Sequence, residues 1–253
     1  MTGSQRPTVK KKNCGFTLIE MAMVLMIVGL LLGGLLPTIS SQVEQRNVTE
    51  TRKQLDEIQQ ALIGFAVING RLPCPATSAT NGVESPVTGT GICDHPYDGY
   101  LPAATLGLSG TSSSGLVLDS WGNPIRYAVT SWNSNTFTIP NGMRTVGISG
   151  LTPTSLLVCS SATNITNSSC GSGYFITSSG NGVPAVIFST GKNGAQGSAG
   201  IGIDEAANLA GYPRFVSHLP APSGATNGAF DDIVIWISPN VLINRMVTAG
   251  KLP

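Results

Sequence analysis

The chain has 253 residues, of which 41% are hydrophobic, and this fraction excludes a wholly disordered chain because it can fill a core. Arg6 and residues 10–12 (KKK) precede Phe16 with no acidic residue among them, whereas beyond Gly15 ten Lys and Arg face thirteen Asp and Glu. This acidic body argues against a general nucleic-acid-binding surface. With 31 Gly, 16 Pro and only 11% charged residues, the composition favours a loop-rich extracytoplasmic domain over a cytosolic enzyme.

The first predicted element is an apolar helix over residues 16–37, in which Glu20 is the one ionisable residue. Its length suits a membrane span of ~30 Å, and the preceding lysines predict a cytoplasmic N-terminus. A secretory signal peptide fits poorly, because the apolar run is too long and no small-residue cleavage site follows it. A plain membrane anchor leaves Glu20 unexplained, since a carboxylate near the head of a membrane segment is costly.

Residues 15–20 read GFTLIE, and with the lysines before them and the apolar run after them they resemble the prepilin signature of type IV pilins and type II secretion pseudopilins. The resemblance implies that a prepilin peptidase removes the leader, residues 1–15, by cutting between Gly15 and Phe16. It also implies N-methylation of Phe16. Glu20 would pair with the N-terminal amine of a neighbouring subunit during assembly, or with its own amine. Pro37 lies where many family members have a helix-kinking proline.

An amphipathic half of the same helix is expected over residues 38–70. Its apolar stripe has helical spacing and consists of Val48, Leu55, Ile58, Leu62 and Phe65. Asn69-Gly70 is typical of a helix C-terminus, and Pro73 forbids continuation. The stripe needs a partner surface, which we expect the sheet of a head domain to provide.

The head, residues 71–253, is predicted to be β-rich, so the fold class is α+β with a mostly antiparallel sheet. The resemblance to pilins implies that this fold is pilin-like. Leu72 to Ser114 is expected to be a long connecting loop. Strands are predicted at Ile125–Thr130, Thr136–Ile139, Arg144–Ile148, Leu156–Cys159, Tyr174–Thr177, Ala185–Ser189 and Asp231–Ile237. A terminal helix over Asn240–Ala249 is expected, with Ser238 as N-cap and Pro239 in the first turn.

A second resemblance lies at residues 119–127, which read DSWGNPIRY and resemble the D-x-W-G-x-P-x-x-Y stretch of major pseudopilins. Gly122 to Pro124 are expected to form a turn that leads into a strand. Trp121 and Tyr127 are expected to pack in the core rather than to form a ligand site.

Five cysteines are present, and Cys14 would leave with the leader. The remaining four allow three disulfide connectivities in an oxidising compartment. We favour Cys74–Cys93 and Cys159–Cys170, because each pair brackets a polar, Gly-rich loop. A zinc site has no supporting C-x-x-C spacing.

Residues 189–194 read STGKNG and partly resemble the calcium loop of major pseudopilins, S-x-G-x-D-G, with Asn193 where the family has Asp. Calcium takes oxygen ligands, and the expected set is Asn193, Asp204, Asp231 and Asp232. The alternative is that Asn193 forms a tight turn and the two later aspartates cap a strand.

No P-loop, nucleophile elbow or acid/base carboxylate spacing occurs in the sequence, so an enzyme is not expected. The interpretation is a minor pilin or pseudopilin of the bacterial inner membrane, with its head in the periplasm before assembly. Its expected partners are other pilin subunits, the prepilin peptidase and the inner-membrane assembly platform. Alternatives are a tip adhesin or DNA-binding minor pilin, or an anchored periplasmic protein that does not assemble.

Overall fold

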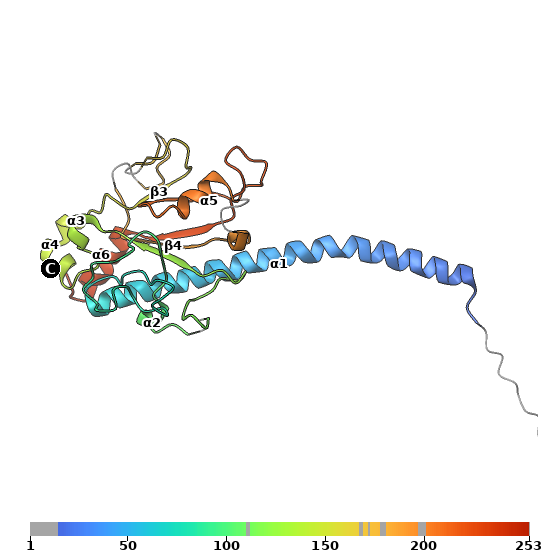
Figure 1. Ribbon diagram of the computed structural model, residues 1–253, viewed down its shortest axis with the longest axis horizontal. Coiled ribbons are helices and arrows are strands. Elements are labelled where there is room, and N and C mark those ends of the chain that lie inside the picture. The colour runs from blue at the N-terminus through green and yellow to red at the C-terminus, as the bar shows by residue number, and fades with distance from the viewer. Residues whose placement is uncertain are drawn as a thin grey trace, which may run out of the picture. The chain divides into compact units, whose positions relative to one another are not determined.

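The computed structural model describes residues 15–109, 112–166, 169–171, 173–177, 181–196 and 201–252, apart from the side chains of residues 32–39 and 196. Most of the expected leader, with Cys14, lies outside the described residues, as does the side chain of Pro37. The chain divides into two units, Met1–Arg46 and Asn47–Pro253, and each is described by itself (Figure 1).

The first element is α1, Leu18–Asn69, which confirms the expected long helix. The helix ends at Gly70, where φ is 70° and the amide donates to the carbonyl of Ala66 at 2.8 Å. The expected membrane-spanning segment over residues 16–37 is not confirmed. Within the described part of the chain, no helix combines the length and apolar character that crossing a membrane requires.

Among the described residues, four strands form an antiparallel sheet in the order β1-β2-β4-β6, and two further strands form a small parallel sheet. The strands of the larger sheet are β1 Gly99–Tyr100, β2 Arg126–Val129, β4 Ala185–Ser189 and β6 Ile233–Ile237. The smaller sheet pairs β3, Leu157–Cys159, with β5, Arg214–Val216. The mostly antiparallel sheet expected from the sequence is therefore present.

The remaining helical elements are short. They are α2 Ala103–Leu106, α3 Trp132–Asn135, α4 Gly142–Val146, η1 Ile148–Gly150, η2 Gly194–Gln196, α5 Ile203–Asn208 and α6 Pro239–Thr248. Helix α6 is the predicted terminal helix, with Ser238 as N-cap and Pro239 at its first position, although the Ser238 side chain makes no capping hydrogen bond. The expected loop over Leu72–Ser114 holds β1 and α2 as its regular elements.

The two faces of the large sheet pack against different layers, because side chains alternate along each strand. Ile187 and Ile237 face the core shared with α1 and α6. Val186 and Phe188 face the opposite core, where they meet Phe215 of β5. Figure 1 shows β3 and α5 on the other side of β4 from the second half of α1.

The apolar stripe of α1 fills the first of these cores. Leu55 and Leu62 are fully buried, Ile58 is 3% exposed, and Val48 packs against them. Burying each such side chain contributes about 1.5–3 kcal/mol to folding. Phe65 is only half-buried, and its ring lies under the guanidinium of Arg71 at 5.5 Å. The head and residues 47–69 therefore form one folded body.

Three strand predictions are wrong. The segment Thr136–Ile139 is a turn, because Asn133, Ser134 and Asn135 all have positive φ and reverse the chain before it. Arg144–Ile148 belongs mostly to α4, which begins at Gly142, where a Cβ would lie 2.4 Å from a backbone oxygen. In Tyr174–Thr177, Phe175 alone forms a bridge, with Cys159. In these segments the apolar residues reflect packing of a turn, a short helix and a loop, and not of strands.

Candidate functional site

Residues 15–17 lead directly into α1. Gly15 and Phe16 both precede the helix, and Phe16 is 82% exposed. Among the described residues, no atom lies within 4 Å of where a Cβ on Gly15 would be. Within the described part of the chain, the junction between Gly15 and Phe16 is therefore exposed.

Glu20 and Thr17 form a reciprocal cap at the start of α1. The Glu20 carboxylate accepts the backbone amide and the hydroxyl of Thr17, both at 2.8 Å, and the Thr17 hydroxyl accepts the Glu20 amide at 3.3 Å. This is the capping-box arrangement of T-x-x-E, which satisfies amides left unpaired at a helix start. This capping role was not predicted from the sequence, although the T-x-x-E spacing is present at residues 17–20.

The beginning of α1 displays apolar side chains around its whole circumference. Every residue from Gly15 to Leu31 is exposed, with Leu18 at 89% and Leu25 at 66%. A helix that is apolar on all sides requires an apolar environment to cover it.

Within the head, Asp119 connects the two segments that resemble pseudopilins. Its buried carboxylate accepts the amides of Trp121 and Asn123, at 2.9 and 2.8 Å, and the hydroxyl of Ser189 at 2.5 Å. The Asn123 side chain in turn donates to the carbonyl of Gly191 at 2.6 Å. The D-x-W-G-x-P turn therefore holds the STGKNG loop in position. Sequence analysis assigned no role to Asp119.

The two aromatic residues of that motif lie as expected. Tyr127 is 1% exposed, and its hydroxyl donates to the carbonyl of Pro73 at 3.1 Å. Trp121 is half-buried and packs against the same core.

An acidic cluster lies beside the STGKNG loop. Carboxylate oxygens of Glu205, Asp231 and Asp232 lie within 4.8 Å of one another. Asn193 donates to Glu205 at 2.9 Å, while its own Oδ1 is buried and, within the described structure, has no hydrogen-bond partner. Gly191 permits the approach, because a Cβ there would lie 2.1 Å from Oδ1 of Asp231. Three of the four expected calcium ligands therefore surround Glu205.

The fourth expected ligand, Asp204, faces elsewhere. Its carboxylate accepts the amide of Ala162 at 2.5 Å and the side chain of Asn227 at 3.0 Å, and it lies 3.1 Å from Nε2 of His218. Consecutive helical residues point about 100° apart, so Asp204 and Glu205 of α5 face different sides. Glu205, which sequence analysis did not select, occupies the place expected for Asp204.

Burial and like charge change the acidity of this cluster. Desolvation raises the pKa of Asp232 well above its usual range, and the neighbouring carboxylates of Glu205 and Asp231 raise it further. A hydrogen bond from Asn208 at 2.7 Å acts in the opposite direction. A bound divalent cation would relieve both the desolvation and the repulsion.

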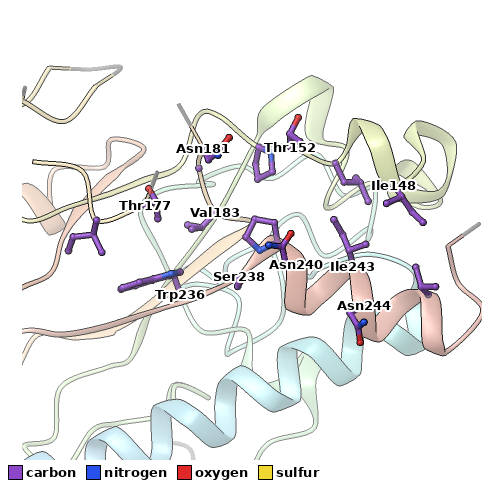
Figure 2. Close-up of a pocket in the computed structure, with 16 residues that line it drawn as sticks. Ile148, Thr152, Thr177, Asn181, Val183, Trp236, Ser238, Asn240, Ile243 and Asn244 are labelled. Carbon is purple, nitrogen blue, oxygen red and sulfur yellow. The ribbon is translucent and has the colours of Figure 1, made fainter. Parts of the chain in front are cut away.

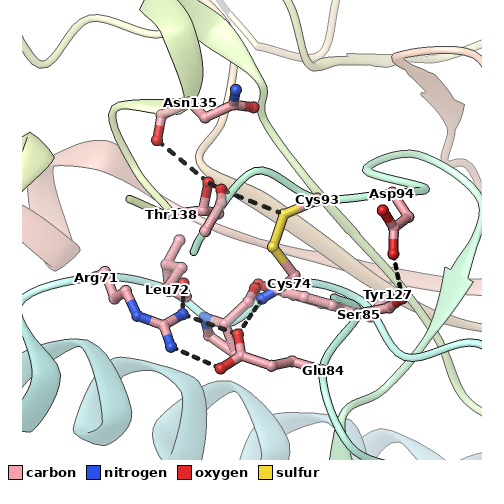
Figure 3. Close-up of a disulfide and its surroundings, with 12 residues drawn as sticks. Arg71, Leu72, Cys74, Glu84, Ser85, Cys93, Asp94, Tyr127, Asn135 and Thr138 are labelled. Carbon is pink, nitrogen blue, oxygen red and sulfur yellow. Dashed lines mark hydrogen bonds and ion pairs between the residues drawn. A yellow bond between two sulfur atoms is a disulfide. The ribbon is translucent and has the colours of Figure 1, made fainter. Parts of the chain in front are cut away.

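The two expected disulfides are present, Cys74–Cys93 and Cys159–Cys170, with Cα–Cα distances of 5.3 and 5.6 Å. The first lies beside a bidentate ion pair, shown in Figure 3, in which Arg71 contacts Glu84 at 2.6 and 2.8 Å. Glu84 also accepts the amide of Cys74 at 3.0 Å. The disulfide and the ion pair together hold the loop after α1.

Comparisons with known proteins support the prepilin motif at the N-terminus. Residues 10–36 match the family described as the prokaryotic N-terminal methylation motif. The chain is also similar to the type II secretion system core protein G of Pseudomonas aeruginosa, with 28% identity over 118 residues. That similarity covers 47% of this chain and 75% of the relative. No solved structure is significantly similar to the chain. The prepilin motif and the homology to a pseudopilin are thus confirmed.

Proposed function

We propose that this protein is a non-enzymatic filament subunit, either a pseudopilin of a type II secretion system or a type IV pilin. The observation that supports this most directly is the start of α1. There an open Gly15–Phe16 junction precedes a capped carboxylate at Glu20 and a helix apolar on all sides. Each feature suits one step of prepilin maturation and assembly.

In the proposed mechanism, cleavage after Gly15 makes Phe16 the N-terminus and N-methylation follows. The hydrogen bonds from Thr17 hold the Glu20 carboxylate at the helix start, and they involve no residue of the leader. A neighbouring subunit's amine would then meet a carboxylate already in place. Burial of the exposed apolar side chains against other copies would supply about 1.5–3 kcal/mol for each large side chain that is fully covered.

The methylation motif supports anchoring in the inner membrane before assembly, with the prepilin peptidase, the assembly platform and other pilin subunits as partners. The head, residues 71–253, would then decorate the filament surface. We assign the chain as a minor or specialised subunit because its 238 residues beyond the leader exceed what a minimal major pilin needs.

A second function, calcium binding, is proposed for the acidic cluster. The buried Oδ1 of Asn193, which has no donor among the described residues, supports it together with the three converging carboxylates. Calcium takes six to eight oxygens, and the carbonyl groups of the STGKNG loop would complete the set. The proposed role is to join that loop to the strand β6, which follows Asp232.

N-terminal sequencing and intact mass of the protein recovered from membranes and sheared filaments test the principal proposal. We expect a chain that begins at methylated Phe16. Gly15→Val should block processing, because it places a branched side chain beside the peptide bond that the peptidase must reach. Gly29→Ala changes an equally uncrowded glycine within α1 and should leave processing unchanged. A chain that retains its leader in cells with an active prepilin peptidase would reject the proposal.

A further inference from the structure

A groove in the head lies outside every site described above. Its cavity volume is about 760 Å³. One side is formed by α6 and the end of β6, and the other by residues 148–153, 176–177 and 181–183. Figure 2 shows Trp236 and Thr177 toward one end of it and Ile148 and Ile243 toward the other. This volume is within the range of sites that hold small ligands.

The side chains that line the groove are all uncharged. Polar groups come from both sides, with Asn181 and Thr152 on the loops and Asn240 on α6, and all three residues are exposed. Amides and hydroxyls can both donate and accept hydrogen bonds. The surface therefore suits a ligand that offers many neutral donors and acceptors, and its described lining residues offer no charge to attract an ion.

Trp236 adds an aromatic surface to these polar groups. It is half-buried, so part of the indole remains open to the groove. An aromatic face is electronegative and attracts weakly positive C–H groups. A ligand with an apolar C–H face and a rim of hydroxyls would suit both the indole and the exposed polar side chains.

An extended peptide fits this groove less well. Peptides commonly dock by adding a strand to a sheet edge, and β6 is an edge strand here. The carbonyl of Trp236 on that strand already accepts the side-chain amide of Gln59 at 2.8 Å. Strand addition beside the groove would have to break this bond.

We propose that the groove between α6 and residues 148–153, 176–177 and 181–183 binds a neutral carbohydrate chain. Trp236 packs against the C–H face of a sugar ring, and Asn181, Asn240 and Thr152 exchange hydrogen bonds with its hydroxyls. The inference concerns the head alone and does not depend on processing at Gly15.

The test uses the full-length chain in a zwitterionic detergent, because detergents with sugar headgroups would compete. Cellotetraose, maltotetraose and chitotetraose are titrated while saturation-transfer NMR and tryptophan emission are recorded. We expect saturable binding of at least one tetrasaccharide. Asn181→Ala and Asn240→Ala should each raise its Kd about five- to tenfold, the loss expected for one hydrogen bond.

Both asparagines are exposed, so these substitutions should leave the fold intact. Gln60→Ala, which removes an exposed amide from α1 outside the groove, is the matched control and should leave the Kd unchanged. Trp236→Phe keeps an aromatic residue in the packing and should weaken binding too. The proposal is overturned if no tetrasaccharide saturates, if the asparagine variants bind like the parent, or if a neutral Gly-Ser peptide binds in their place.

Discussion

Glu20 accepts both the backbone amide and the hydroxyl of Thr17, each at 2.8 Å. The same carboxylate thus caps its own helix and is proposed to pair with a neighbour's amine. Glu20→Gln separates the two roles, because glutamine can also serve in a capping box but carries no charge. We expect both Glu20→Gln and Glu20→Ala to lower the yield of sheared filaments, by about tenfold if the charge pair contributes 1.4 kcal/mol.

Glu57→Gln is the control for that experiment, since Glu57 is an exposed residue of α1. It should assemble like the parent chain. Filament yields for Glu20→Gln equal to those of the parent, with Glu20→Ala defective, would show that capping alone matters and would remove charge pairing from the mechanism.

Asp119→Ala should destabilise the head. It leaves the amides of Trp121 and Asn123 and the hydroxyl of Ser189 without their acceptor in a buried site. We expect the free energy of unfolding to fall by about 3 kcal/mol, measured by urea denaturation. The exposed Asp56→Ala should change it by less than about 0.5 kcal/mol. Equal stability of the two variants would contradict the role given to Asp119.

Removal of either disulfide should lower the free energy of unfolding by about 3 kcal/mol in the loop-entropy model. The model gives this value because the bonded cysteines are 19 residues apart in Cys74–Cys93 and 11 residues apart in Cys159–Cys170. In one variant Cys74 and Cys93 are both replaced by serine, and in a second variant Cys159 and Cys170 are. The free energy of unfolding of each variant is measured by urea denaturation and compared with that of the parent chain. Cys14→Ser should have no effect on the mature protein, since the proposed cleavage removes it. A pair whose loss leaves the unfolding midpoint unchanged would contradict that bond's stabilising role.

Calcium should raise the Tm of the head relative to the protein in a chelator. At one hundred times the Kd, the expected stabilisation is about 2.7 kcal/mol. Glu205→Gln should abolish the response, because Glu205 contacts both Asn193 and the Asp231 amide. Asp204→Asn should retain it, since that side chain faces away. A Tm that is the same with calcium and with chelator would dispose of the calcium site.

Without calcium, Asp232 should make stability depend on pH. Its folded pKa is raised above the unfolded value of about 3.9, so the protonated form is favoured by folding. The contribution is complete below about pH 4 and is lost as the pH rises through the folded pKa. Asp232→Asn should remove this loss and stabilise the protein at neutral pH, by about 1.4 kcal/mol for each unit of pKa shift.

The test measures the midpoints of urea unfolding of the parent chain and of Asp232→Asn over a series of pH values, with a chelator present. Calcium should favour the charged carboxylate, so its stabilising effect should grow with pH in the parent chain. Parallel pH profiles for the parent and Asp232→Asn would show that this carboxyl does not titrate with folding.

The elements that the sequence predicted well are those whose signals are local. β4 has the predicted bounds, Ala185–Ser189, because a short apolar run buried on both faces needs no further context. Helix α1 follows from its stripe and its Asn69-Gly70 stop. The turn at Thr136–Ile139 was mistaken for a strand, since Phe137 is fully buried and apolar while its backbone is irregular.

The prepilin motif and the long helix could be predicted from the sequence, and the disulfide pairing that the sequence favoured among three is the one present, because each depends on residues close together in the chain. Tertiary structure alone decided which carboxylate of Asp204 and Glu205 joins the acidic cluster, since that depends on how α5 is rotated against β6. It alone brought Asp119 to Ser189 and assembled the neutral groove around Trp236. Such sites are made by segments far apart in sequence, and only packing of the whole head determines which of their side chains meet.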